Sequence, residues 1–130
     1  MRQILTLLVT ILVFGATSSV FAADDPSITG KPRTGSQEAM SNHIEKNVLG
    51  DNYIIYDDVS GKLMMLEFKE LHSGIVKKGD FYVSCADFVD AQGNKYDLDF
   101  FVAEDGGEYK LYDAIVHKVN GDKRPYNLDQ

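Results

Sequence analysis

The side chains best suited to chemistry in this chain are a histidine, a cysteine and three carboxylates: His72, Cys85, Asp87, Asp97 and Asp99. In the hairpin register that the sequence predicts, Asp87 lies opposite Asp99, and His72 falls near Cys85. Directly opposed residues in a sheet have Cβ atoms about 5 Å apart. The carboxylates with His72 are therefore a candidate site for a hard cation, and the Cys85–His72 pair is a candidate nucleophile. An acidic sheet face that partly meets a second subunit is the competing interpretation.

A second candidate site lies on the strand expected over residues 108–119. Alternation places Asp113 and His117 on the face that looks toward the helix. Tyr82 and Tyr96, from neighbouring strands, are expected on the same face. A carboxylate there either lines a cavity between helix and sheet or lies at a strand end that reaches water. The cavity interpretation predicts a pocket for a small apolar molecule or a lipid, with enzymatic use of Asp113 as one version of it.

The opposite, outer face of the same sheet is expected to be less polar than a solvated face. Apolar and aromatic side chains share it with the three aspartates: Phe81, Val83, Cys85, Phe101 and Tyr112. Exposed apolar patches of this kind usually meet a partner. The pattern predicts self-association through the outer face, so that a homodimer or a complex with a periplasmic protein is the expected assembly.

The elements that must position these residues are one helix followed by a meander of strands. Residues 36–49 carry apolar side chains at a spacing of four, with Ser36 placed as N-cap and Gly50 as the glycine that ends the helix. From residue 52 onward the period is two, and glycines mark the turns. The expected fold is α+β, with one N-terminal helix packed on a curved antiparallel meander sheet of four to five strands.

The predicted register follows from the turns between the last three strands. With Gly93 at the centre of one turn, Phe88 faces Leu98, and a two-residue Asp-Gly turn further on places Phe100 opposite Leu111. These pairings agree on a single inner face, which would also carry Ile115 and which the apolar stripe of the helix would cover.

The strand expected over residues 62–76 does not keep its alternation to the end. The apolar pattern slips after Phe68, which predicts one extra residue in the strand, a β-bulge near Lys69–Glu70. Ser73–Gly74 is the competing position for this bulge.

The N-terminal residues have the form of a secretory signal peptide. An apolar run of about 11 residues follows Arg2 and is short for a bilayer span. Val20-Phe21-Ala22 fits the small-x-small rule for signal peptidase, so that Ala23 is the expected first residue after cleavage. The protein is therefore expected to be periplasmic or secreted, with no integral membrane segment after cleavage.

The rest of the chain divides by composition. A lead rich in glycine and proline is expected to be flexible over residues 23–35, a single α+β domain to occupy residues 36–122, and a polar tail to follow at residues 123–130.

Charge and cysteine content exclude several classes of protein. The net charge is −7 at pH 7, whereas binding to nucleic acid requires clustered Lys and Arg. Cys85 is the one cysteine of the sequence, so an intrachain disulfide is excluded. No stretch carries a catalytic or cofactor-binding signature, and the expectation is a non-enzymatic binding domain without a cofactor.

One helix followed by a curved antiparallel meander resembles the cystatin-like superfold, which includes cystatins and nuclear transport factor-like domains. The segment Gly106–Gly121 is similar to the last strand of the nuclear transport factor-like domains and of periplasmic phospholipid carriers, with matching positions at Tyr109, Lys110, Leu111 and Asp113. The resemblance implies a helix that packs on a coiled sheet. It does not imply protease inhibition, because the chain has neither a Gln-x-Val-x-Gly hairpin nor any tryptophan.

Overall fold

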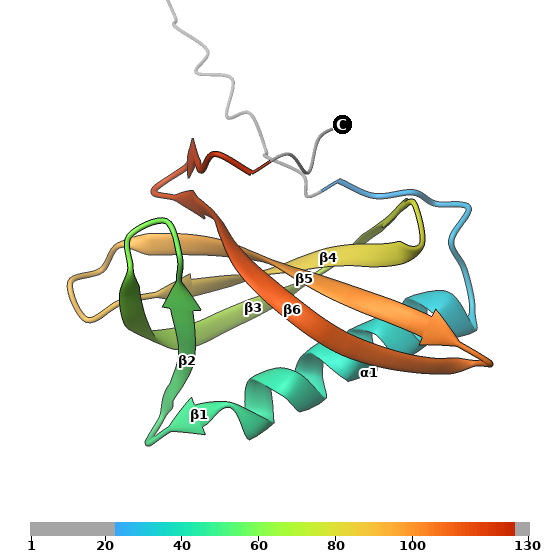
Figure 1. Ribbon diagram of the computed structural model, residues 1–130, viewed down its shortest axis with the longest axis horizontal. Coiled ribbons are helices and arrows are strands. Elements are labelled where there is room, and N and C mark those ends of the chain that lie inside the picture. Colours follow the sequence, from blue (N-terminus) through green and yellow to red (C-terminus); the bar gives the residue numbers. More distant parts are fainter. Residues whose placement is uncertain (1–22, 127–130) are drawn as a thin grey trace, which may run out of the picture.

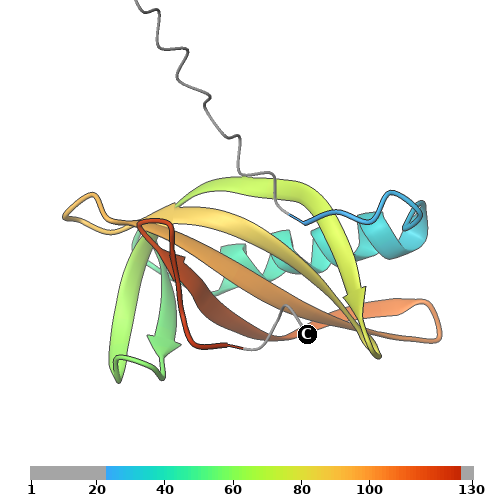
Figure 2. The same cartoon turned by 90° about the horizontal axis from the view of Figure 1, so that it is seen from above.

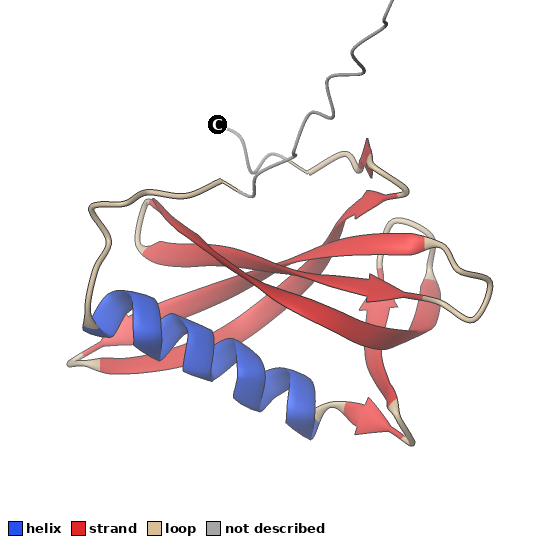
Figure 3. Cartoon of the chain, turned by 180° about the vertical axis from the view of Figure 1, so that it is seen from behind, coloured by secondary structure: helices blue, strands red, loops and turns tan. Residues whose placement is uncertain are grey.

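The computed structural model describes residues 23–126, which form one helix and one antiparallel sheet (Figures 1 and 3). The elements in chain order are α1 (Lys31–Lys46), β1 (Val48–Leu49), β2 (Asn52–Asp57), β3 (Lys62–Lys78), β4 (Phe81–Val89), β5 (Lys95–Asp105), β6 (Glu108–Val119) and β7 (Asp122–Lys123). Each strand pairs with the next one along the chain. The predicted signal peptide at residues 1–22 lies outside the described residues.

The α+β class and the antiparallel meander are confirmed. The described residues form seven strands rather than four to five. The difference lies in β1 and β7, because segments of two residues are too short to show any periodicity. In Figure 2 the β2–β3 hairpin bends away from the longer strands, so that the sheet is strongly coiled.

The helix begins five residues before the predicted Ser36, and it ends at Lys46 rather than at the predicted Leu49, because Val48–Leu49 form β1. Pro32 lies in its first turn, where the missing N–H of proline costs nothing, and Gly30 precedes it at a φ of 64°. Ser36 is buried within the helix, and Asn47 caps the C-terminus with its backbone N–H on the His43 carbonyl. The residues predicted as a flexible lead therefore include the start of α1. No helix among residues 23–126 is long and apolar enough to cross a bilayer.

The core lies between α1 and the concave face of the sheet. Met40 and Ile44 of the helix pack on a set of fully buried side chains from the middle strands: Ala86, Phe88, Leu98, Phe100, Val102 and Val116. Burying a side chain of this size contributes about 1.5–3 kcal/mol. Helix and sheet approach closely at Gly35, where an added Cβ would lie 2.4 Å from the ring of Tyr109.

The bulge predicted in β3 is confirmed, and a second one follows it. The β3–β4 register shifts between Phe68 and Glu70, and again between Leu71 and Ile75, which spans the competing position at Ser73–Gly74. Bulges bend and twist a strand, so both account for part of the coiling of the sheet.

The predicted register of the last three strands is wrong, although the inner face of β4 and β5 is correct. Phe88 pairs with Tyr96 rather than Leu98. The carboxylate of Asp90 accepts hydrogen bonds from the backbone N–H groups of Gln92 and Asn94, and this stabilises a loop over residues 90–94 that is centred on Gln92 rather than on Gly93.

Two bulges also change the pairing of β6 with β5. The register shifts so that Tyr112 and His117 are extra residues, and Phe100 pairs with Ala114. Val116 therefore fills the core in place of the predicted Ile115, which pairs with Asp99 on the outer face.

Candidate metal centre

A stripe of ionisable and thiol side chains crosses the outer face of four adjacent strands. It consists of His72 on β3, Cys85 and Asp87 on β4, Asp97 and Asp99 on β5, and His117 and Lys118 on β6. Cys85 pairs with Asp99, and Asp87 pairs with Asp97. The bulge at His117 brings that ring to the outer face, where Nδ1 lies 3.1 Å from Asp99 Oδ2.

His72 connects two members of the stripe through opposite sides of its ring. Its Nδ1 lies 2.9 Å from Cys85 Sγ, and its Nε2 lies 2.9 Å from Asp87 Oδ2. A carboxylate on one ring nitrogen orients a histidine so that the other nitrogen is available as a metal ligand. The contact with Asp87 therefore orients the His72 ring so that Nδ1 faces the thiol of Cys85.

Asp97 completes a group of three different donor types. One donor atom from each of His72, Cys85 and Asp97 lies within 4.8 Å of the other two. Asp97 Oδ1 is buried and has no hydrogen-bond partner among the described residues, and Oδ2 lies 3.9 Å from Lys118 Nζ. Burial raises the pKa of Asp97 although Lys118 is near.

The thiol of Cys85 lies in surroundings that oppose its ionisation. Burial raises the pKa of Cys85 strongly, and the negative charges of Asp97, Asp99 and Asp87 raise it further. Without a bound cation the sulfur is therefore a protonated thiol, which is a poor nucleophile. A metal ion would reverse this, because a coordinating thiol is deprotonated outright.

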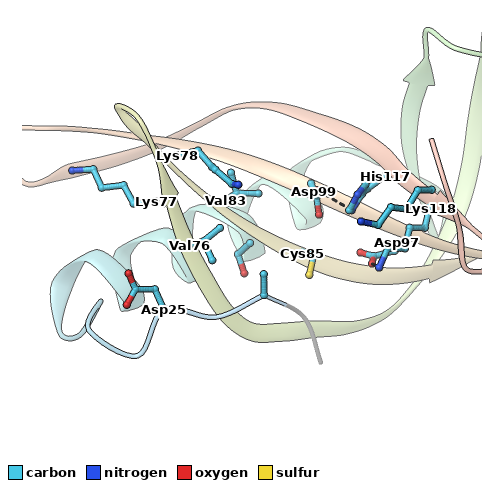
Figure 4. Close-up of a pocket in the computed structure, with 13 residues that line it drawn as sticks. Asp25, Val76, Lys77, Lys78, Val83, Cys85, Asp97, Asp99, His117 and Lys118 are labelled. Atoms are coloured by element: carbon cyan, nitrogen blue, oxygen red, sulfur yellow. Dashed lines mark ion pairs between the residues drawn. The ribbon is translucent and has the colours of Figure 1, made fainter. Parts of the chain in front are cut away.

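A cavity of about 500 Å³ opens beside this group (Figure 4). Its lining includes Cys85, Asp97 and Asp99 from the middle strands and His117 and Lys118 from β6. Figure 4 shows the sulfur of Cys85 and the carboxylate of Asp97 on the same side of the sheet. Cys85 and Asp97 would thus be reached from this cavity, whereas His72 and Asp97 line a neighbouring cavity of about 540 Å³.

The four residues predicted to line one pocket between helix and sheet are not brought together. Tyr82 and Tyr96 lie on the inner face and are buried, as predicted, whereas His117 lies on the outer face. Asp113 is exposed and lines a separate cleft of about 410 Å³ with residues of α1 and β2, among them His43 and Tyr53. The β6 bulges account for this separation, because each reverses the alternation on which the prediction rested.

The predicted interface residues divide into two groups. Val83 and Cys85 lie on the outer face but are 7% and 9% exposed. Phe81, Phe101 and Tyr112 form an aromatic cluster with ring centroids 5.4–6.2 Å apart, and Tyr112 is 53% exposed.

The sequence correctly predicted His72 near Cys85 and included Asp97 among the candidate ligands, but the predicted pairing of Asp87 with Asp99 is wrong. Asp97 rather than Asp99 lies opposite Asp87, because the β4–β5 register differs by two residues from the predicted one. Comparison of the chain with protein-family models, with curated proteins and with solved structures finds no match.

Proposed function

We propose that this chain is an exported, non-enzymatic binding domain whose ligand is a divalent transition-metal ion held by His72, Cys85 and Asp97. The observation that carries the proposal is the convergence of an imidazole nitrogen, a thiol and a carboxylate oxygen within 4.8 Å of one another. The signal peptide predicted at residues 1–22 supports a periplasmic or extracellular location. A cystatin-like fold is part of the same proposal, supported by the order of one helix and a meander sheet.

The donor types favour one class of metal. Nitrogen and sulfur ligands suit Zn²⁺ and its neighbours in the first transition row, whereas Ca²⁺ and Mg²⁺ take oxygen ligands. Donor atoms around a tetrahedral zinc ion lie about 3–4 Å apart, so a movement of roughly 1 Å by Asp97 suffices to complete the set. This revises the hard cation expected from the three aspartates alone.

The same geometry resembles a nucleophile, since Cys85, His72 and Asp87 lie in the order thiol, base and orienting acid. The electrostatics favour the metal. Activated cysteines have a lowered pKa and lie in positive surroundings, whereas Cys85 has a raised pKa and three carboxylates beside it.

The experiment is a titration of the protein with Co²⁺, which reports a thiolate ligand by an intense near-ultraviolet charge-transfer band, followed by competition with Zn²⁺. We expect the band in the wild type, its loss in Cys85→Ser, and binding weakened at least tenfold in Asp97→Asn. Asp113→Asn, which removes an exposed carboxylate from the separate cleft, is the matched control and should bind normally. Equal Co²⁺ binding by the wild type and Cys85→Ser would reject the site, and rapid alkylation of Cys85 at neutral pH would favour the nucleophile.

A second candidate function is self-association through the aromatic cluster of Phe81, Phe101 and Tyr112. The exposure of Tyr112 favours it. Measurement of solution mass by light scattering tests it: a dimer is expected for the wild type and a folded monomer for Phe101→Glu. An unchanged mass for the variant would exclude this interface.

A further inference from the structure

The segment before the helix is fixed to the edge of the sheet. The backbone N–H of Asp25 donates to the Ile75 carbonyl at 2.8 Å, and Asp24 Oδ1 accepts from the Ile75 N–H at 3.0 Å. Arg33 adds an ion pair of 2.9 Å to Asp24 and a hydrogen bond of 2.6 Å to the Ser73 carbonyl. Three of these contacts involve Asp24 or Asp25, and they leave little freedom in where the chain runs just before Asp24.

This anchoring places Ala23 on the cavity beside the candidate metal centre. Ala23 lines the same cavity as Cys85, Asp97 and Asp99. In Figure 4 the segment that carries Asp25 continues along the side of the sheet on which the Cys85 sulfur lies. The residue that the small-x-small pattern predicts as the first after cleavage is thus a lining residue of the site.

We propose that cleavage after Ala22 releases the α-amino group of Ala23 into this cavity, where its nitrogen becomes the fourth ligand of the metal ion. This inference rests on the proposed metal-binding function. His72, Cys85 and Asp97 supply three donors, and zinc sites with three protein donors keep a fourth position for another ligand. Cys85 and Asp97 both line the cavity that Ala23 reaches, so the fourth position faces the new chain end.

An α-amino group suits this position better than the lysines around the cavity. It releases its proton far more readily than a lysine ammonium, and only the neutral amine has a lone pair for a metal. Before cleavage the same nitrogen belongs to a peptide bond with Ala22 and has no such lone pair. Removal of the leader would then complete the metal site, so that the precursor binds the ion weakly and the exported protein binds it tightly.

A variant that displaces the terminal amino group, with His72, Cys85 and Asp97 unchanged, tests the inference. The full chain is expressed with its own leader and recovered after export, beside a variant with Gly-Ser inserted between Ala22 and Ala23. Intact mass gives the first residue of each product. The insertion moves the chain end by about 7 Å, further than a metal–nitrogen bond can span.

We expect the natural product to begin at Ala23 and to bind Co²⁺ at least tenfold more tightly than the Gly-Ser product, while both show the thiolate-to-cobalt band. Each protein is also prepared with Cys85→Ser, and in that background the insertion should change nothing. Equal affinity of the two Cys85 proteins, or a natural product that does not begin at Ala23, would overturn the inference and leave the three-donor site intact. Absence of the thiolate band from all samples would instead reject the metal site itself, and the fourth ligand with it.

Discussion

Asp57 and Asp97 each have one buried carboxylate oxygen without a hydrogen-bond partner among the described residues, and they differ in what the other oxygen contacts. The side chain of Asp57 is fully buried, and its Oδ2 accepts hydrogen bonds from Ser60 Oγ at 2.5 Å and from Arg124 at 2.6 Å. Asp97 is 21% exposed, and its Oδ2 lies 3.9 Å from Lys118 Nζ.

The pKa directions follow from these partners. Burial alone would raise the pKa of Asp57, but the hydrogen bonds from Ser60 and Arg124 and the charge of Arg124 outweigh it and lower the pKa. For Asp97 burial prevails and the pKa is raised. Asp57 therefore serves stability, because Arg124 pairs directly with its negative charge, whereas the positive charges near Asp97 do not offset its burial.

The largest loss of stability is expected when Asp57 loses the cation that pairs with it. Arg124→Met leaves a fully buried carboxylate without its cation, which should lower the free energy of unfolding by about 3–5 kcal/mol. Urea denaturation measures it. Lys118→Met, which removes the distant cation of Asp97, is the control and should cost less than about 1 kcal/mol. Similar losses in both variants would remove the distinction between the two acids.

The next largest effect is stabilisation by Zn²⁺, which should depend on Asp97 and not on Asp57. At a Zn²⁺ concentration one hundred times the dissociation constant, the wild type should gain about 2.7 kcal/mol of stability. Asp57→Asn should keep this gain, whereas Asp97→Asn should lose most of it. Thermal unfolding with and without Zn²⁺ measures both, and an equal gain in the two variants would mean that the ion binds elsewhere.

Acidification should reveal the contribution of Asp57. Because its pKa is lower in the folded than in the unfolded state, the stabilisation is present above the unfolded pKa and is lost as the pH falls through the folded value. Asp57→Asn should therefore cost about 2 kcal/mol at neutral pH and less at acidic pH, as measured by urea unfolding across a pH series. A cost that does not change with pH would contradict the ion pair.

Asp97 should show the opposite and smaller dependence in metal-free protein. Its raised pKa means that its stabilising contribution is present below the unfolded pKa and is lost as the pH rises through the folded value. Asp97→Asn should thus be more stable than the wild type at neutral pH, by about 1 kcal/mol, and the two should converge on acidification. The same pH series measures it, and a less stable variant at neutral pH would show that Asp97 has a partner that offsets its burial.

Most of the fold could be predicted from short-range sequence patterns, namely the hydrophobic period and the positions of turn glycines. The period of two and the turn glycines predicted β2 and β6 at their observed bounds, and the slip after Phe68 predicted the first bulge of β3. The helix start was wrong because Ser36 has the side chain of an N-cap, whereas its position in the structure is the buried face of the helix. Propensity for a cap cannot outweigh the apolar contacts that bury that face.

The candidate site could be predicted only in part because it depends on register. His72 and Cys85 were correctly predicted to be neighbours, because they lie on β3 and β4 and the two-residue error in register lies between β4 and β5. The partner of Asp87 and the sheet face of His117 were predicted wrongly, because a loop stabilised by Asp90 and a one-residue bulge in β6 do not alter the periodicity of the sequence. Between Leu111 and Val119 both the odd-numbered and the even-numbered positions include apolar residues, so the sequence pattern does not show which set faces inward. Packing against α1 determines the inward set.

The sequential pairing of the strands has a consequence for how the chain folds. Each hairpin joins neighbours in sequence, so the sheet has a low contact order and is expected to fold quickly. Two side-chain hydrogen bonds that close long loops lie at the two ends, where Asp24 bonds to Ile75 and Arg124 bonds to Asp57 across 51 and 67 positions. Loop closure of that length is entropically costly, so these two ends should dock last and open first in hydrogen exchange.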